Sequence, residues 1–240
     1  MFALGRGTGD SAARTGEGLI IAIDGPSGAG KSTLAKRLAK ALNFVYLDTG
    51  AMYRALALKA LREGLDLADD ALSEEWVART EIDLQEKAGK LEVFLDGENV
   101  AAQIRTPEIS QMASKVSALR VVRNRMLELQ RAMGKRGSVV AEGRDIGTVI
   151  FPEAEIKVFL DASVCERARR RYDELTASGR AVNLDETRRE IEERDKRDRE
   201  RDVAPLRKAE DAMLIDSSSV DADAVAAMVL ARIRNESREN

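Results

Sequence analysis

The amino-acid sequence predicts an α/β fold: a five-stranded parallel sheet flanked by helices. Five short apolar segments alternate with helical stretches, which is the order that parallel strands joined by crossover helices require. The first apolar segment leads directly into a glycine-rich turn, and one block of alternating residues breaks the rhythm. At 240 residues, with 44% hydrophobic and 34% charged side chains, the chain is long enough for one large domain that carries an insertion.

The five predicted strands are short apolar runs, as expected for strands buried on both faces of a parallel sheet. They span residues 19–24, 44–47, 138–141, 156–160 and 212–215. The predicted helices span residues 31–42, 49–61, 107–133, 186–202 and 225–234. In the second of these helices, Met52, Leu56 and Ala60 fall on one side.

Residues 81–100 alternate with a different period and predict a small antiparallel β insert. Turn signals at 87–90 and at Asp96–Gly97 separate two alternating runs. We place the insert at about 81–105, inside a domain that spans residues 19–240. Residues 1–18 hold five glycines and no apolar block of signal-peptide length, so we expect a disordered arm there.

The composition excludes several kinds of chemistry. Without histidine, the chain has no Ser-His-Asp triad, no imidazole base and no His-ligated metal. One cysteine allows neither an intrachain disulfide nor a cysteine metal site, and fits a reducing, cytoplasmic compartment. A net charge of −3 gives no overall basic field, so we expect no nucleic-acid partner. No apolar stretch approaches the length of a membrane span, and a monomer is the default expectation.

Residues 25–32 read GPSGAGKS and fit the phosphate-binding pattern G-x-x-x-x-G-K-[ST], between a predicted strand and a predicted helix. Backbone N–H groups of such a P-loop surround phosphates at the positive end of the helix dipole. We expect Lys31 to reach the β- and γ-phosphates and the Ser32 hydroxyl to ligate Mg²⁺. The expected nucleotide contacts are Gly25, Pro26, Ser27, Gly28, Ala29, Gly30, Lys31, Ser32 and Thr33.

A P-loop leaves three classes open: a small-molecule phosphotransferase, a GTPase switch and an NTPase that drives a macromolecule. The guanine motif N-K-x-D is missing, because the nearest string, DKRD at Asp195, lacks the asparagine. No basic surface supports a macromolecular motor. Arginines beside the predicted strand ends favour the phosphotransferase.

Four motifs in order resemble the bacterial cytidylate kinase family: GPSGAGKS, LDTGAMYR at residues 47–54, EGRDIGTVIFP at 142–152 and ERDKRDRERDVAPL at 193–206. The resemblance covers about residues 19–234. In that family the position of Ser32 is often glycine and that of Thr49 often serine, and both residues here keep a hydroxyl.

The resemblance implies transfer of the γ-phosphoryl group of MgATP to CMP or dCMP. A phosphate acceptor is already nucleophilic at neutral pH, which agrees with a chain that lacks histidine. By resemblance, Arg54 and Arg144 grip the CMP phosphate, and Asp145 accepts a hydrogen bond from the cytosine amino group. The other residues assigned to CMP by resemblance are Asp48, Thr49, Ser114, Arg123, Arg194, Asp198 and Arg201.

Residues 192–202 are all charged. In a helix, Arg194, Asp198 and Arg201 would share a stripe about 60° wide, so one face is expected to serve the substrate and the others solvent. Upstream, a lid is expected at about 167–184, with Arg167 and Arg171 as donor-phosphate contacts or ordinary surface arginines. Lys31, Arg144 and Arg171 are the candidate catalytic residues. A kinase for UMP or AMP, and a nucleotide-binding protein without turnover, remain the alternatives.

Overall fold

A computed structural model describes residues 18–65, 74–87, 90–135 and 137–239, so the predicted arm lies, apart from Gly18, outside the described residues. The strands are β1 (Ile20–Asp24), β2 (Val45–Asp48), β3 (Ile82–Lys87), β4 (Lys90–Leu95), β5 (Glu98–Asn99), β6 (Val139–Gly143), β7 (Ile156–Asp161) and β8 (Met213–Asp216). The helices are α1 (Lys31–Leu42), α2 (Thr49–Arg62), α3 (Glu74–Ala78), η1 (Gln103–Arg105), α4 (Pro107–Val116), α5 (Arg120–Gly134), η2 (Ile146–Ile150), α6 (Val164–Ala177), α7 (Leu184–Glu200) and α8 (Ala222–Glu239).

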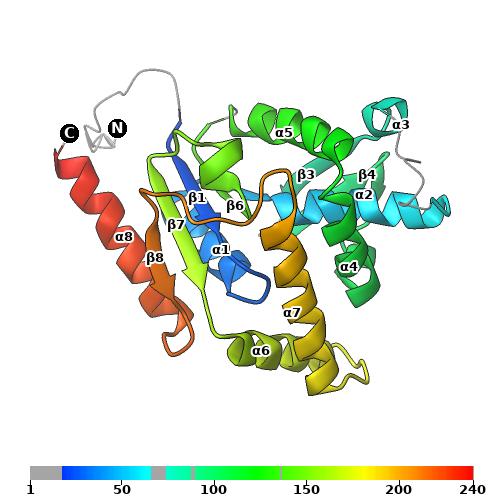
Figure 1. Cartoon of the computed structure of the whole chain (residues 1–240). Helices are drawn as coiled ribbons and strands as arrows, with labels where there is room; N and C mark the ends of the chain where they lie inside the picture. Colours follow the sequence, from blue (N-terminus) through cyan, green and yellow to red (C-terminus); the bar gives the residue numbers. More distant parts are fainter. Residues whose placement is uncertain (1–17, 66–73, 88–89, 136, 240) are drawn as a thin grey trace, which may run out of the picture.

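The main sheet has five parallel strands, as the sequence predicts, and their order is β2-β6-β1-β7-β8. Their carboxyl ends point toward α6 and α7 (Figure 1). The register sets Asp24 opposite Gly143 and Asp48 opposite Glu142. Because parallel strands end at the same edge, the loops after β1, β2 and β6 meet there.

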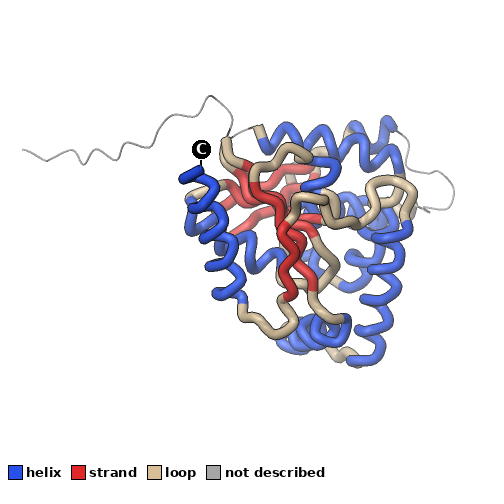
Figure 2. Tube along the Cα trace, turned by 60° about the vertical axis from the view of Figure 1, so that its left-hand side comes forward, coloured by secondary structure: helices blue, strands red, loops and turns tan. Residues whose placement is uncertain are grey.

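Helices cover both faces of this sheet (Figure 2). Alternate residues of β1 serve opposite faces: Ile21 and Ile23 belong to the apolar core with α1 and α8, whereas Ala22 belongs to the core with α2 and α5. All three side chains are fully buried. This two-sided burial explains why the strands read as continuous apolar runs.

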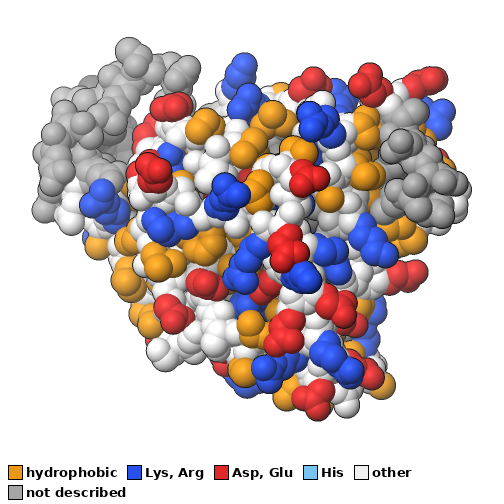
Figure 3. Space-filling model, in the orientation of Figure 1, with side chains coloured by type: hydrophobic (Ala, Val, Ile, Leu, Met, Phe, Trp, Pro, Cys, Tyr) orange, Lys and Arg blue, Asp and Glu red, His pale blue; other side chains and the backbone are white. Residues whose placement is uncertain are grey.

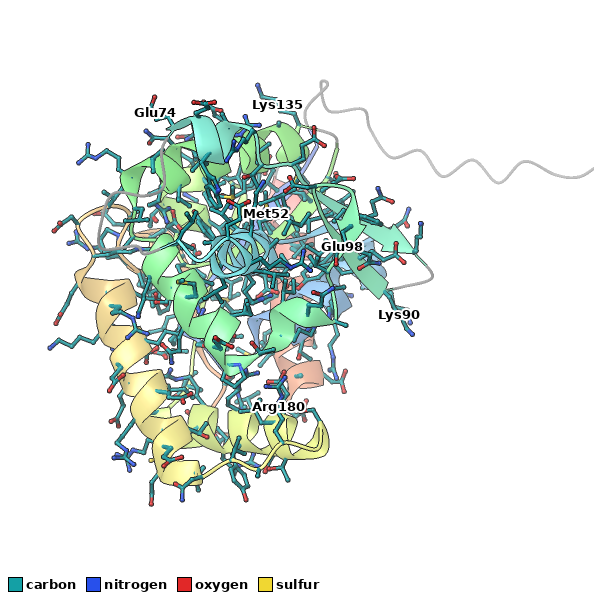
Figure 4. The ribbon with its side chains drawn as sticks, turned by 90° about the vertical axis from the view of Figure 1, so that its right-hand side faces the viewer. Met52, Glu74, Lys90, Glu98, Lys135 and Arg180 are labelled. Atoms are coloured by element: carbon teal, nitrogen blue, oxygen red, sulfur yellow. The ribbon has the colours of Figure 1, made fainter. Side chains whose placement is uncertain are left out.

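The predicted insert is an antiparallel sheet in the order β3-β4-β5. Figure 4 shows it at the side of the body, where Lys90 and Glu98 are labelled, whereas Arg180 lies on the α6–α7 connection at another edge. Two pairs tie the insert to α2: Lys59 with Asp96 at 2.6 Å, and Arg62 with Glu98 at 2.7 Å.

The predicted helix over 107–133 is wrong in one respect, because it is broken into α4 and α5. The amides of Ala118 and Leu119 bond to carbonyls three residues back, at Lys115 and Val116, which tightens and ends the first helix. The Ser117 hydroxyl also donates to the Ser114 carbonyl at 2.9 Å. The break allows residues of α4 and α5 to line the same pocket.

Replacing Gly134, the last residue of α5, with alanine is expected to destabilise the protein, although alanine is the better helix former. A Cβ at Gly134 would lie 2.5 Å from Cζ and 2.6 Å from Cε1 of Phe151, so the ring would have to move. We expect the free energy of unfolding in urea to fall by about 1–3 kcal/mol. Gly134→Ala/Phe151→Leu should recover part of this loss. A single variant as stable as the wild type would contradict the packing.

Candidate functional site

The glycine-rich turn after β1 curls around the side chain of Lys31, whose Nζ donates to the Pro26 carbonyl at 2.6 Å. Gly25 has φ 147°, and a Cβ there would lie 1.9 Å from the carbonyl oxygen of Leu160. Gly30 caps α1 with φ 94°. Lys31 is buried, and burial followed by repulsion from Arg144 lowers its pKa. An anion in the turn would restore the charged ammonium.

A cavity of about 540 Å³ opens from this turn. Basic side chains dominate its lining: Lys31, Lys36, Arg54, Arg105, Arg144, Arg170, Arg171 and Arg194. Five of these eight basic residues were predicted as site residues, while Lys36, Arg105 and Arg170 were not. Three carboxylates, Asp48, Glu142 and Glu174, also line the cavity, so the lining carries excess positive charge.

A smaller pocket of about 40 Å³ adjoins the basic cavity and shares Arg144 and Arg194 with it. The remaining predicted residues for the acceptor, apart from those in the basic cavity, line this pocket: Thr49, Ser114, Arg123, Asp145, Asp198 and Arg201. They come from α2, α4, α5, α7, the residue directly after α7 and the β6–η2 loop. The fold therefore brings these six side chains together in one pocket, and their contact with a substrate stays a prediction.

Asp145 is buried and faces two arginines in this pocket. It forms an ion pair with Arg123, and Nη2 of Arg201 lies 3.6 Å from its other oxygen. Burial raises the pKa of Asp145, although Arg123 and Arg201 oppose that shift. An ionised carboxylate can accept about four hydrogen bonds, so it can still accept a donor from a ligand.

Asp198 lines the small pocket and contacts both arginines that the small pocket shares with the basic cavity. It accepts hydrogen bonds from the Ser114 hydroxyl at 3.1 Å and from Nε of Arg144 at 2.8 Å, and Arg194 lies 3.9 Å away. Burial opposes ionisation of Asp198, but Arg144 and Arg194 outweigh it and lower its pKa to about 2. The carboxylate therefore stays charged and holds the two arginines in place.

α7 ends at Glu200, two residues before the predicted end, so Arg201 lies just past the helix rather than on its face. Its guanidinium is fixed by the Ala204 carbonyl at 2.8 Å and by the Ser117 hydroxyl at 3.1 Å. Arg201 still lines the small pocket, and its amide bonds to the Arg197 carbonyl at 3.1 Å at the end of α7.

A third pocket, of about 510 Å³, lies on the other side of the P-loop. It shares Gly30, Thr33 and Arg170 with the basic cavity. Leu34 and Leu160 supply apolar walls, Glu166 and Arg169 of α6 add charged groups, and the loop after β8 with the start of α8, residues 217–222, lines another side. Sequence reasoning missed this pocket because the serine-rich loop matches no motif.

Arg170 joins the third pocket to the P-loop side of the sheet. Its guanidinium donates to the Ser217 carbonyl at 2.6 Å and to the Ser217 hydroxyl at 3.1 Å, and its Nε pairs with Glu166 at 2.8 Å. The neighbouring Arg171 points into the basic cavity and pairs with Glu174 at 2.8 Å.

Arg167, in contrast, does not line any of the three pockets. Its side chain is 2% exposed and donates to the carbonyls of Ala162 at 2.8 Å and Ser27 at 3.1 Å. It also pairs with the buried carboxylate of Asp195 at 2.6 Å. Arg167 thus connects α6 to the P-loop and to α7. These partners are protein groups, whereas the sequence led us to expect a contact with the donor phosphates.

Oxygen atoms suited to a hard cation lie near Ser32. Ser32 lines the basic cavity together with Asp48 and Glu142. Glu142 accepts a hydrogen bond from the Tyr46 hydroxyl, and burial followed by repulsion from Asp48 raises its pKa. In the described part of the chain, no group of three or more acidic or cysteine side chains forms a metal centre on its own. A cation here would need ligand oxygens in addition to those of the protein.

Figure 3 shows acidic and basic side chains interspersed on one face, without a large area of a single sign. Within the described residues, no helix combines the length and the apolar character that crossing a membrane requires.

The P-loop follows the central strand at the carboxyl end of a parallel sheet, and the basic cavity beside it shares lining residues with two further pockets. These features define a P-loop nucleotide-binding protein of the kinase type. The sequence profile of the family described as cytidylate kinase matches residues 21–235. The chain belongs to the cytidylate kinase family.

Individual relatives agree with this assignment. The cytidylate kinase of Pelotomaculum thermopropionicum is 53% identical over 220 residues, which covers 91% of this chain and 97% of the relative. That of Syntrophotalea carbinolica is 56% identical and covers 86% and 88%. That of Bacillus subtilis is 48% identical and covers 92% and 98%.

Replacing Arg167 with methionine is expected to lower the free energy of unfolding by about 3–5 kcal/mol, because Asp195 would be left as an uncompensated buried charge. Urea denaturation measures this loss. The variant Arg167→Met/Asp195→Leu should recover much of it. Arg188→Met, which breaks the exposed Arg188–Glu192 pair on α7, serves as the control and should change stability little. A small effect of Arg167→Met would show that the buried pair does not hold α6 to α7.

Proposed function

We propose that this protein transfers the γ-phosphoryl group of MgATP to CMP or dCMP, giving ADP and CDP or dCDP. The observation that carries the proposal is the position of Asp145, a buried carboxylate in the small pocket that adjoins the basic cavity. Membership of the cytidylate kinase family agrees with it. The relatives named above carry that activity in their names.

On the donor side, the P-loop would hold the β- and γ-phosphates, with Lys31 between them. The third pocket supports a position for the nucleoside of ATP, since it adjoins the loop at Gly30 and Thr33 and has apolar walls. Arg170 would then lie between nucleoside and phosphates, since it lines both spaces.

On the acceptor side, Asp145 would accept the cytosine amino group, and Arg123 beside it would donate to the acceptors of the base. Asp198, ionised and already bonded to Ser114, would accept a ribose hydroxyl. Uracil presents a carbonyl where cytosine has its amino group, so Asp145 would face it without a donor. That mismatch is the argument against a UMP kinase.

Catalysis would consist of positioning and charge neutralisation, because a phosphate acceptor needs no base. Arg54 and Arg144 would hold the acceptor phosphate, and Lys31 with Arg171 would face the transferring group. Burial and then repulsion from Arg144 lower the pKa of both Lys31 and Arg194, so phosphate oxygens would stabilise their charged forms.

Mg²⁺ is the proposed cofactor. The Ser32 hydroxyl would ligate it, Asp48 and Glu142 line the same cavity, and phosphate oxygens would supply further ligands. When bound, the cation would neutralise charge on the β- and γ-phosphates.

We further propose that residues 167–184, from α6 to the start of α7, act as a lid over the donor phosphates, in a domain of residues 19–240. A monomer in the cytoplasm fits the single cysteine and the mixed surface charge. Neither a nucleic acid nor a membrane is proposed as a partner.

The direct test is ADP release from MgATP with CMP, dCMP, UMP, AMP and dTMP measured in parallel. We expect strong stimulation by CMP and dCMP only. Stimulation by UMP or AMP alone would keep the P-loop kinase and discard the cytosine pocket. Tight ATP binding without acceptor-dependent ADP release would favour a nucleotide-binding protein without turnover.

Asp145→Ala is expected to reduce the preference for CMP over UMP by about tenfold or more, because a charge-assisted hydrogen bond to the base is lost. The KM for MgATP should change much less. Arg144→Ala should damage both the KM for CMP and kcat, since Arg144 would hold the phosphate. Steady-state kinetics with both acceptors measure these effects. An unchanged CMP-to-UMP ratio in Asp145→Ala would reject the base-pocket assignment.

A further inference from the structure

The loop that carries Arg144 and Asp145 is fixed at both ends by side chains from other elements. On one side, the hydroxyl of Thr49 donates to the Glu142 carbonyl at 2.7 Å. On the other side, the amides of Ile146 and Gly147 donate to the carboxylate of Asp24 at 2.7 and 2.8 Å. Only three residues, 143–145, lie between these anchors.

The carboxylate of Asp24 accepts hydrogen bonds from backbone amides that have no partner in their own turn. Asp145 caps the start of the turn η2, and its carbonyl accepts from the amides of Val149 and Ile150. The first amides of such a turn have no partner within it, and the two oxygens of Asp24 each take one of them. Asp24 is buried at the end of β1, directly before the P-loop.

We infer that Asp24 is a positioning residue of the acceptor site, which acts through Ile146 and Gly147 to place Asp145 against the base and Arg144 against the acceptor phosphate. This rests on the proposed function. Asp24 lines none of the three pockets, so its effect would pass through the loop rather than through contact with a nucleotide.

The charge of Asp24 matters for this role, because a protonated carboxyl would turn a hydrogen toward one of the two amides. The pKa of Asp24 is raised to about 7. Burial is the largest cause and Asp145 adds to it, whereas the two amide hydrogen bonds and Lys31 on α1 act to lower the pKa. Lys157 of β7 packs beside Gly147 but is bonded to Pro152 and Asp211. Ionised Asp24 accepts both amides, so the loop should be held best above about pH 7.

The test compares Asp24→Asn with Asp161→Asn. Asparagine keeps the shape of Asp24 but offers one acceptor, and its amide would face the second backbone N–H. Asp161 ends the neighbouring strand β7, and among the residues that the structure describes its carboxylate accepts the adjacent amide of Ala162 alone, at 2.8 Å. It therefore controls for the loss of a strand-end carboxylate away from the acceptor loop.

For Asp24→Asn we expect kcat/KM with CMP to fall about tenfold or more, and the CMP-to-UMP ratio to fall with it. The affinity for MgADP and the urea midpoint should stay close to those of the wild type. Asp161→Asn should keep the wild-type ratio. An unchanged ratio in Asp24→Asn, or equal losses in MgADP and CMP affinity, would overturn the inference.

If Asp24→Asn fails to fold, wild-type protein provides a second measurement: binding of cytidine, which has no phosphate to titrate, between pH 5.5 and 8.5. Affinity that rises through about pH 7 supports the role of ionised Asp24, and a flat profile overturns it. A wild type that phosphorylates no cytidine nucleotide would instead reject the proposed function itself, a result distinct from any difference between the variants.

Discussion

Mutual repulsion among cations is the constraint on which the rest of the site depends. Eight Lys and Arg side chains line one cavity of about 540 Å³. Two like charges about 4 Å apart repel by roughly 4 kcal/mol at an effective dielectric constant of 20. The structure limits this cost by pairing Arg54 with Asp48 and Arg144 with Asp198, and by lowering the pKa of buried Lys31. Phosphate ligands would complete the neutralisation, so the architecture itself favours a polyanionic ligand.

The run of eleven charges in and after α7 shows how one segment meets several demands. Its members 194, 198 and 201 face the site, and Asp195, one residue along, is buried against Arg167 of α6. Arg197 contacts α4 through Gln111 and Ser114. The other six, among them Glu192 and Lys196, are exposed. The charged side chains of α7 and of the two residues after it thus point in different directions around the helix axis, toward α6, toward the small pocket and toward solvent.

Motifs with a local cause were predictable from the sequence, and long-range partners were not. The P-loop, the α1 boundaries and the insert follow from glycine positions, hydrophobic periodicity and turn residues. The resemblance gave the residues of the small pocket. The break at residues 117–119 has no glycine or proline to announce it. The sequence does not distinguish Arg167 from Arg171, since both lie in the same arginine-rich stretch. The packing of α6 against α7 buries Arg167 beside Asp195 and leaves Arg171 in the lining of the basic cavity.

Two buried carboxylates show that stability and site geometry impose different demands. Asp198 has a pKa of about 2 against 3.8 in a free carboxyl, so it stabilises the fold above about pH 4 and loses that contribution as pH falls toward 2. Asp24 has the opposite sign: its pKa of about 7 means that the folded state binds a proton more tightly than the unfolded chain does. Stability from Asp24 therefore falls as pH rises from about 4 to 7. The stability of the fold therefore gives no reason for an ionised carboxylate at position 24. The two amides at the start of η2 do, because a carboxylate can accept both of them at once and so fix the loop that presents Arg144 and Asp145.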